Sequence, residues 1–73
     1  MELNEQILKC LKQALEDEKI AVETYKRFSK ECKGEPHIEE MFLQFSKNER
    51  WHVLAIEEKI NWFSSNDKKT VEE

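Results

Sequence analysis

Apolar residues recur every three or four positions along two long stretches of this 73-residue chain. This spacing places them on one face of an α-helix, because residues three and four apart lie on the same side of a helix. The pattern therefore predicts two amphipathic helices of the kind found in helical bundles. The stripes are Ile7, Leu11, Ala14, Glu18, Ala21, Tyr25, Phe28 and Cys32, then Ile38, Phe42, Phe45, Glu49, His52, Ile56, Lys59 and Phe63.

The only glycine and the only proline, Gly34 and Pro36, lie between the two stretches. Glycine is favoured just after a helix ends, and proline in the first turn of the next helix. We therefore predict a first helix over about residues 4–33, a turn at 34–35 and a second helix over about residues 36–64. A turn this short makes the two helices antiparallel neighbours.

The ends of the chain carry weaker signals. Asn4 is a candidate N-cap for the first helix. The run Ser64, Ser65, Asn66 and Asp67 predicts the end of the second helix, because these residues favour turns over helix interiors. Residues 1–66 would then form one domain, and residues 67–73 a frayed polar tail.

A hairpin of two long helices buries only one line of contact, and a chain this short usually needs a disulfide, a metal or a partner copy for stability. We therefore predict an all-α hairpin that dimerises about a twofold axis into a four-helix bundle. Leu43, Trp51 and Leu54 fall off the stripe, on the back of the second helix, and point to a higher even-numbered oligomer.

The two cysteines, Cys10 and Cys32, do not suggest a disulfide. On one helix they would lie about 33 Å apart, whereas a disulfide needs Cα atoms within about 7 Å. Unpaired thiols fit a reducing compartment, and the sequence shows no signal peptide, so we expect a cytoplasmic protein. The sequence contains no apolar run long enough to predict a membrane span. It also lacks a basic patch with interleaved aromatics, and its net charge is −4, so nucleic acid is not an expected partner.

Three ionisable residues interrupt the apolar stripes away from the helix ends: Glu18, Glu49 and His52. Burying carboxylates is costly unless a positive charge lies beside them. Glu18 lies about 16 residues before the turn, and Glu49 and His52 on average about 16 residues after it. In an antiparallel hairpin all three therefore meet at one height.

A twofold axis at that height would bring two such sets together, giving four glutamates and two histidines. Glu49 and His52 form a Glu-x-x-His motif, whose members project from one helix face. Helical bundles hold two iron or manganese ions with this combination of ligands. Four carboxylates also balance two divalent ions, so we predict two iron ions per dimer, with manganese or zinc as alternatives.

The combination of Glu18-x6-Tyr25 with Glu49-x-x-His52 resembles the iron-binding half-motif of rubrerythrins, and is similar to that of two-helix encapsulated ferritins. The resemblance implies a ferritin-like fold. It also implies that Glu18 and Glu49 are metal ligands, with Glu49 bridging, and that His52 is a terminal ligand. Tyr25 would contact Glu18 and orient it without binding the metal itself. A core aromatic is the alternative role for Tyr25.

The chain also departs from the family. Classical rubrerythrins carry four helices in one chain and a rubredoxin-like module with Cys-x-x-Cys pairs, which this sequence lacks. Peroxide reduction would therefore need an external electron donor. Residues 67–73 also lack the apolar targeting peptide of encapsulated cargo.

Three functions remain open at this point. The first is a di-iron oxidoreductase with ferroxidase or peroxide-reducing activity. The second is a non-catalytic module stabilised by a metal such as zinc or manganese. The third is a metal-free helical interaction module, for which replacing Glu18 or His52 with alanine would not lower stability.

Overall fold

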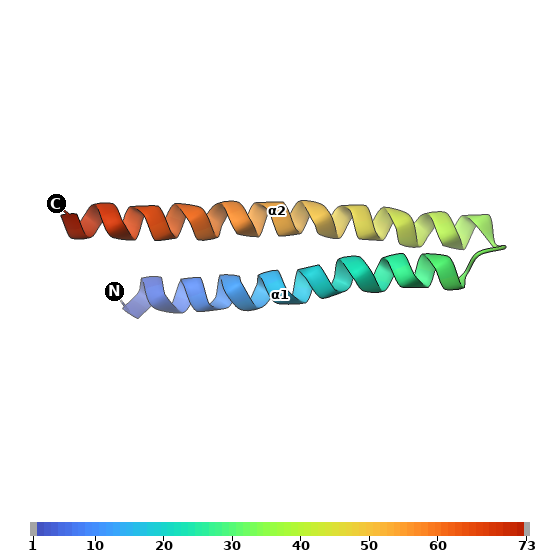
Figure 1. The fold of residues 1–73 in the computed structure, drawn as a ribbon, viewed down its shortest axis with the longest axis horizontal. Coiled ribbons are helices and arrows are strands. Elements are labelled where there is room, and N and C mark those ends of the chain that lie inside the picture. Colours follow the sequence, from blue (N-terminus) through green and yellow to red (C-terminus); the bar gives the residue numbers. More distant parts are fainter. Residues whose placement is uncertain (1, 73) are drawn as a thin grey trace.

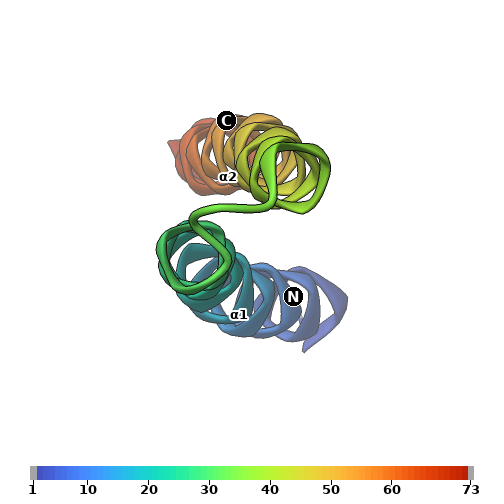
Figure 2. The ribbon, with the colours of Figure 1, turned by 90° about the vertical axis from the view of Figure 1, so that its right-hand side faces the viewer.

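The chain forms a hairpin of two long antiparallel helices (Figure 1). The structure is a computed structural model, which describes the backbone of residues 2–72 and the side chains of residues 3–65. Helix α1 spans Glu2–Glu31 and helix α2 spans Pro36–Glu72. The Cα trace measures 59 × 15 × 11 Å, and the end-on view shows the helices as a single pair (Figure 2). The predicted all-helical hairpin is confirmed.

The turn comprises residues 32–35 and is longer than predicted, because α1 already ends at Glu31. Gly34 adopts a φ of 110°, a left-handed conformation that glycine accepts without strain. The Glu35 carbonyl accepts hydrogen bonds from the amides of Ile38 and Glu39, both at 3.0 Å. Glu35 thus occupies the N-cap position of α2, and Pro36 the first helical position.

The outer ends of both helices extend past their predicted limits. Helix α1 begins at Glu2, so Asn4 lies within its first turn and the N-cap prediction is wrong. Helix α2 continues past Ser64 to Glu72. Serine, asparagine and aspartate lower helix stability by well under about 1 kcal/mol each, so without glycine or proline they do not end a helix. The predicted tail, residues 67–73, lies outside the residues whose side chains are described.

Two serine hydroxyls mark the line of closest contact between the helices. Ser46 Oγ donates to the Val22 carbonyl, and Ser29 Oγ donates to the Glu39 carbonyl, each at 3.1 Å. Val22, Ser29 and Ser46 are the buried residues among the described side chains. Both bonds define one antiparallel register, in which residue 18 lies opposite residue 50.

Aromatic rings fill the half of the hairpin nearer the turn. Phe28 and Phe42 meet edge to face with centroids 5.3 Å apart, and Tyr25 meets Phe45 in the same way at 5.5 Å. Phe45 nevertheless remains 39% exposed. The hairpin therefore covers only part of its aromatic cluster.

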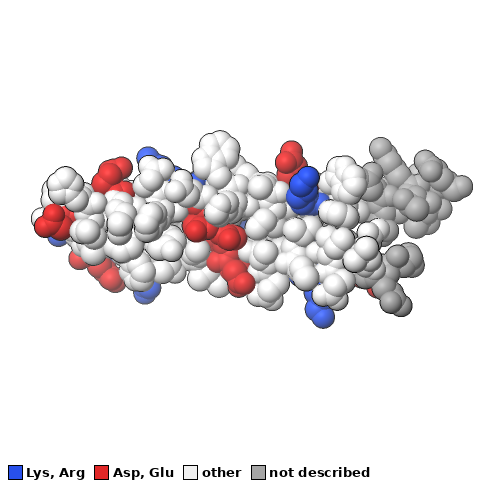
Figure 3. Space-filling view, turned by 180° about the vertical axis from the view of Figure 1, so that it is seen from behind, with Lys and Arg blue, Asp and Glu red and all other residues white. Residues whose placement is uncertain are grey.

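Much of the apolar stripe stays open to solvent. Figure 3 shows a broad, mostly uncharged face with acidic side chains near the middle of its length, a basic group beyond them, and further charged side chains toward its edges. The chain exposes 6003 Å², compared with about 4,800 Å² expected for a compact protein of 8.8 kDa. Exposed hydrophobic residues of this stripe and its borders include Ile38, Met41, Phe45 and Trp62.

Within the described residues, neither helix has an apolar stretch that is long enough to cross a membrane.

Candidate metal centre

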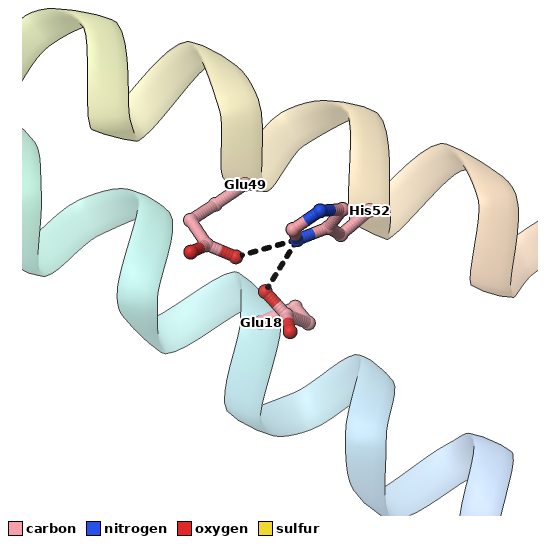
Figure 4. Close-up of side chains that lie close together, drawn as sticks. All are labelled: Glu18, Glu49 and His52. Atoms are coloured by element: carbon pink, nitrogen blue, oxygen red, sulfur yellow. Dashed lines mark hydrogen bonds and ion pairs between the residues drawn. The ribbon is translucent and has the colours of Figure 1, made fainter.

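The structure brings Glu18, Glu49 and His52 together halfway along the hairpin (Figure 4). One ligand atom from each residue lies within 4.8 Å of the other two. His52 Nδ1 lies 3.0 Å from Glu49 Oε1 and 3.6 Å from Glu18 Oε2. Glu49 and His52 come from successive turns of α2, and Glu18 reaches them from α1 because the register places residue 18 between them.

The cluster is partly buried and incompletely paired. The side chains of Glu18 and Glu49 are 29% and 22% exposed, and that of His52 is 59% exposed. Glu18 Oε2 is buried and has no hydrogen-bond partner. A buried acceptor without a partner is costly, and a proton or a cation between the two carboxylates removes that cost.

The three side chains shift one another's pKa values in different directions, upward for Glu18 and His52 and downward for Glu49. The Glu49 carboxylate, with which Glu18 can share a proton, raises the pKa of Glu18, and partial burial adds to this effect. The hydrogen bond from Glu18 lowers the pKa of Glu49, and His52 lowers it further. The hydrogen bond to Glu49 raises the pKa of His52. The raised pKa values mean that Glu18 and His52 keep their protons to a higher pH than usual, at the place where a cation could bind.

Comparison with known protein families gives one match. The family model described as Rubrerythrin matches residues 9–73. This chain belongs to the rubrerythrin family. No curated protein and no solved structure matches it. The family suggests di-iron binding, and the carboxylate–histidine group of this rubrerythrin-family chain could hold a metal ion.

Tyr25 lies at the edge of the cluster rather than within it. Its ring stacks on Phe42 with centroids 6.1 Å apart and packs against Phe45. Among the described side chains, no hydrogen bond joins its hydroxyl to Glu18, so the supporting role that the rubrerythrin resemblance implies stays a prediction. The aromatic packing itself is plain in the structure.

An open pocket of about 470 Å³ adjoins Glu49 and His52. Tyr25 and Phe45 line its apolar side, and Asn48 and Trp51 complete it. The helical stripe gave no signal for Asn48. It placed Trp51 on the back of the second helix, whereas the Trp51 side chain also borders this pocket. The sequence feature that could have identified them is their position, because Asn48 immediately precedes Glu49 and Trp51 immediately precedes His52.

Proposed function

We propose that this rubrerythrin-family chain binds two iron ions per homodimer, with Glu18, Glu49 and His52 supplied by each copy, and acts as a ferroxidase or a peroxide-reducing oxidoreductase. The observation that carries the proposal is the grouping of these three side chains, from two helices, with ligand atoms within 4.8 Å. Glu18 Oε2, buried without a partner, supports the fit of a cation to this group.

One hairpin supplies half of such a centre. Three side chains are too few to hold two ions, whereas the ferritin-like arrangement uses four carboxylates and two imidazoles. A twofold axis at the height of residues 18 and 50 would double the set and leave the hairpins overlapping along their length. Four carboxylates would then neutralise two divalent cations, which removes the repulsion among buried glutamates.

The uncovered stripe supports a partner on this face. The chain exposes about 1,200 Å² more than a compact protein of its mass, and a stable interface buries about 800 Å² per partner. Met41 and Phe45 are each more than a third exposed and lie on the same side of α2 as His52. Contact with a second copy would cover them and close the site.

Two Fe(II) ions held close together would supply two electrons for the reduction of O2 or peroxide. The chain's own residues would set where this occurs. Glu18 from α1, with Glu49 and His52 from α2, would hold the ions between the helices. The pocket beside Glu49 and His52 would admit a small oxidant, and the rings of Tyr25 and Phe45 would exclude water from one side.

Anaerobic Fe(II) titration followed by exposure to O2 or peroxide tests the proposal. We expect saturation near one iron per chain and rapid oxidation of the bound iron. His52→Ala should abolish both, whereas His37→Ala, at the exposed start of α2, should leave both intact. Binding without oxidation would leave a structural metal site, and equal iron binding by the two variants would contradict the proposed ligand set.

A further inference from the structure

Three large hydrophobic side chains are exposed on the side of the hairpin away from the metal centre. Ile20 is 61%, Trp51 71% and Leu54 55% exposed. Each lies two positions after one of the proposed ligands, which rotates it by about 200° around its helix. A dimer that closes the metal centre would therefore leave Ile20 and Leu54 in contact with water. Trp51 extends from the back of α2, where its side chain also borders the pocket beside Glu49 and His52.

These residues belong to two matching stripes. Each stripe has exposed members at the same relative positions, 0, 4, 7 and 11. The first begins with a glutamate and ends with an arginine, and the second begins with a lysine and ends with a glutamate. The α1 outer stripe is Glu16, Ile20, Glu23 and Arg27, and the α2 outer stripe is Lys47, Trp51, Leu54 and Glu58.

Both stripes are hollowed beside their apolar residues. Ile20 and its neighbours on α1 line a shallow pocket of about 420 Å³. Trp51 and Leu54 line one of about 230 Å³ on α2. The groove between the helices lies beside both stripes. It holds two cations and two carboxylates together, so its own charges balance; they are Lys19, Arg50, Glu23 and Glu57.

We propose that a second copy of this chain docks on this outer face, with the α1 outer stripe of each copy against the α2 outer stripe of the other, the paired helices running parallel. Parallel alignment pairs Glu16 with Lys47 and Arg27 with Glu58 of the second copy, and sets Ile20 against Trp51. Antiparallel alignment would instead place Glu16 against Glu58, and like charges facing each other destabilise an interface.

The register within the hairpin makes this contact symmetric. Ser46 lies opposite Val22, so residue 18 lies opposite residue 50. Pairing residue 16 with 47 and residue 27 with 58 then puts the twofold axis between the heights of residues 18 and 19. This is the height of the metal centre, so the two hairpins overlap along their length and each pair of contacts occurs twice.

Two faces of each hairpin would thus bind copies of the same chain. The contact on the outer face uses none of the proposed metal ligands, so it stands independently of the proposed function. With the site-face dimer it produces an assembly larger than two chains, closed or open according to the angle between the two axes.

Charge reversal and its compensation test the contact. We would measure the mass of the full chain by sedimentation for wild type, Glu16→Lys, Lys47→Glu, the double variant and Lys33→Glu, an exposed control in the turn. Each stripe reversal alters two contacts and should weaken the outer-face contact about tenfold or more. Wild type and control should exceed a dimer, the stripe single variants should fall to a dimer, and the double variant should regain the larger mass.

Metal content of the same samples separates this inference from the proposed function, because the reversals should leave metal per chain unchanged. A wild type no larger than a dimer, with single variants of the same mass, would overturn the contact, as would a double variant that stays small. A dimeric wild type whose stripe single variants become monomers would support the contact and contradict the site-face dimer.

Fluorescence gives a second measurement. The chain has two tryptophans, so Trp62→Phe leaves Trp51 as its only indole. Its emission should shift to shorter wavelength as protein concentration rises, and Lys47→Glu should remove that shift. An emission wavelength that is independent of concentration and equal in both variants would contradict the burial of Trp51.

Discussion

The Ser46 hydroxyl donates a hydrogen bond to the Val22 carbonyl, 24 residues away on the other helix, at 3.1 Å. Glu18 lies one turn before Val22 on α1, and Glu49 lies about one turn after Ser46 on α2. This bond and the matching one from Ser29 to the Glu39 carbonyl share one register, which brings the two carboxylates to the same height.

Removing this bond should weaken the hairpin. Ser46→Ala takes away a buried donor that spans the helices, and we expect it to lower the free energy of unfolding by about 1 kcal/mol. Ser64→Ala, on an exposed part of α2, should change it by much less. Denaturant unfolding of both variants provides the measurement, and equal midpoints would show that the bond does not determine the register's stability.

Glu18→Gln should have opposite effects with and without metal. In the metal-free protein the neutral amide relieves the carboxylate contact that raises the pKa of Glu18, so stability at neutral pH should rise. With metal, the loss of one ligand should weaken binding more than about 100-fold, beyond the effect of an outer-shell partner. Thermal unfolding measured with and without Fe(II) shows both the predicted gain in stability of the metal-free variant and the predicted loss of stabilisation by metal. A variant less stable than wild type in both states would contradict the prediction.

Stability of the metal-free protein should fall as pH rises through the folded-state pKa values of Glu18 and His52. The pKa of Glu18 is raised from 4.5, so its ionisation penalty is absent below pH 4.5 and grows as pH rises through the folded pKa. The pKa of His52 is raised from 6.5, so its stabilisation is complete below pH 6.5 and is lost above the folded pKa. Glu49, whose pKa is lowered, contributes stability above pH 4.5 that is lost only under more acidic conditions.

Metal binding should show the reverse dependence on pH, because a metal competes with protons whose binding to Glu18 and His52 is strengthened by their raised pKa values. Calorimetric titration between pH 6 and pH 8 would measure proton release and affinity together. Affinity that is independent of pH across this range, with no proton release, would contradict the assignment of these two residues as ligands.

Closure of the site should depend on the uncovered apolar face. Met41 and Leu43 are each 38% exposed but lie on different sides of α2. Met41→Glu should prevent the site-face dimer and reduce bound metal, because a charge would have to be buried there. Leu43→Glu should retain metal. Elemental analysis of the two purified variants makes the comparison, and equal metal content would argue against a site shared across this face.

The sequence was sufficient to predict the hairpin and the meeting of the three ionisable residues. Gly34 and Pro36 define the connection, and apolar periodicity defines which faces pack. The helix ends were less predictable, because polar residues such as Ser64 and Asn4 reduce helix stability too little to stop a helix that is already formed.

The serine contacts could not be predicted from periodicity. Ser29 and Ser46 look polar and hence exposed, yet both are buried because a short hydroxyl lets two backbones approach closely. Their partners are backbone carbonyls, which no side-chain pattern reveals. Nor does the stripe alone show that His52 is 59% exposed in a single hairpin.

The most direct test of the central claim is the metal content of untagged protein, measured by elemental analysis together with its mass in solution. The shared centre predicts about one iron per chain in a dimer or a larger even-numbered assembly. Protein that contains no metal, and takes up no Fe(II), Mn(II) or Zn(II) in anaerobic titration, would show that Glu18, Glu49 and His52 are only polar residues at the edge of a helical contact.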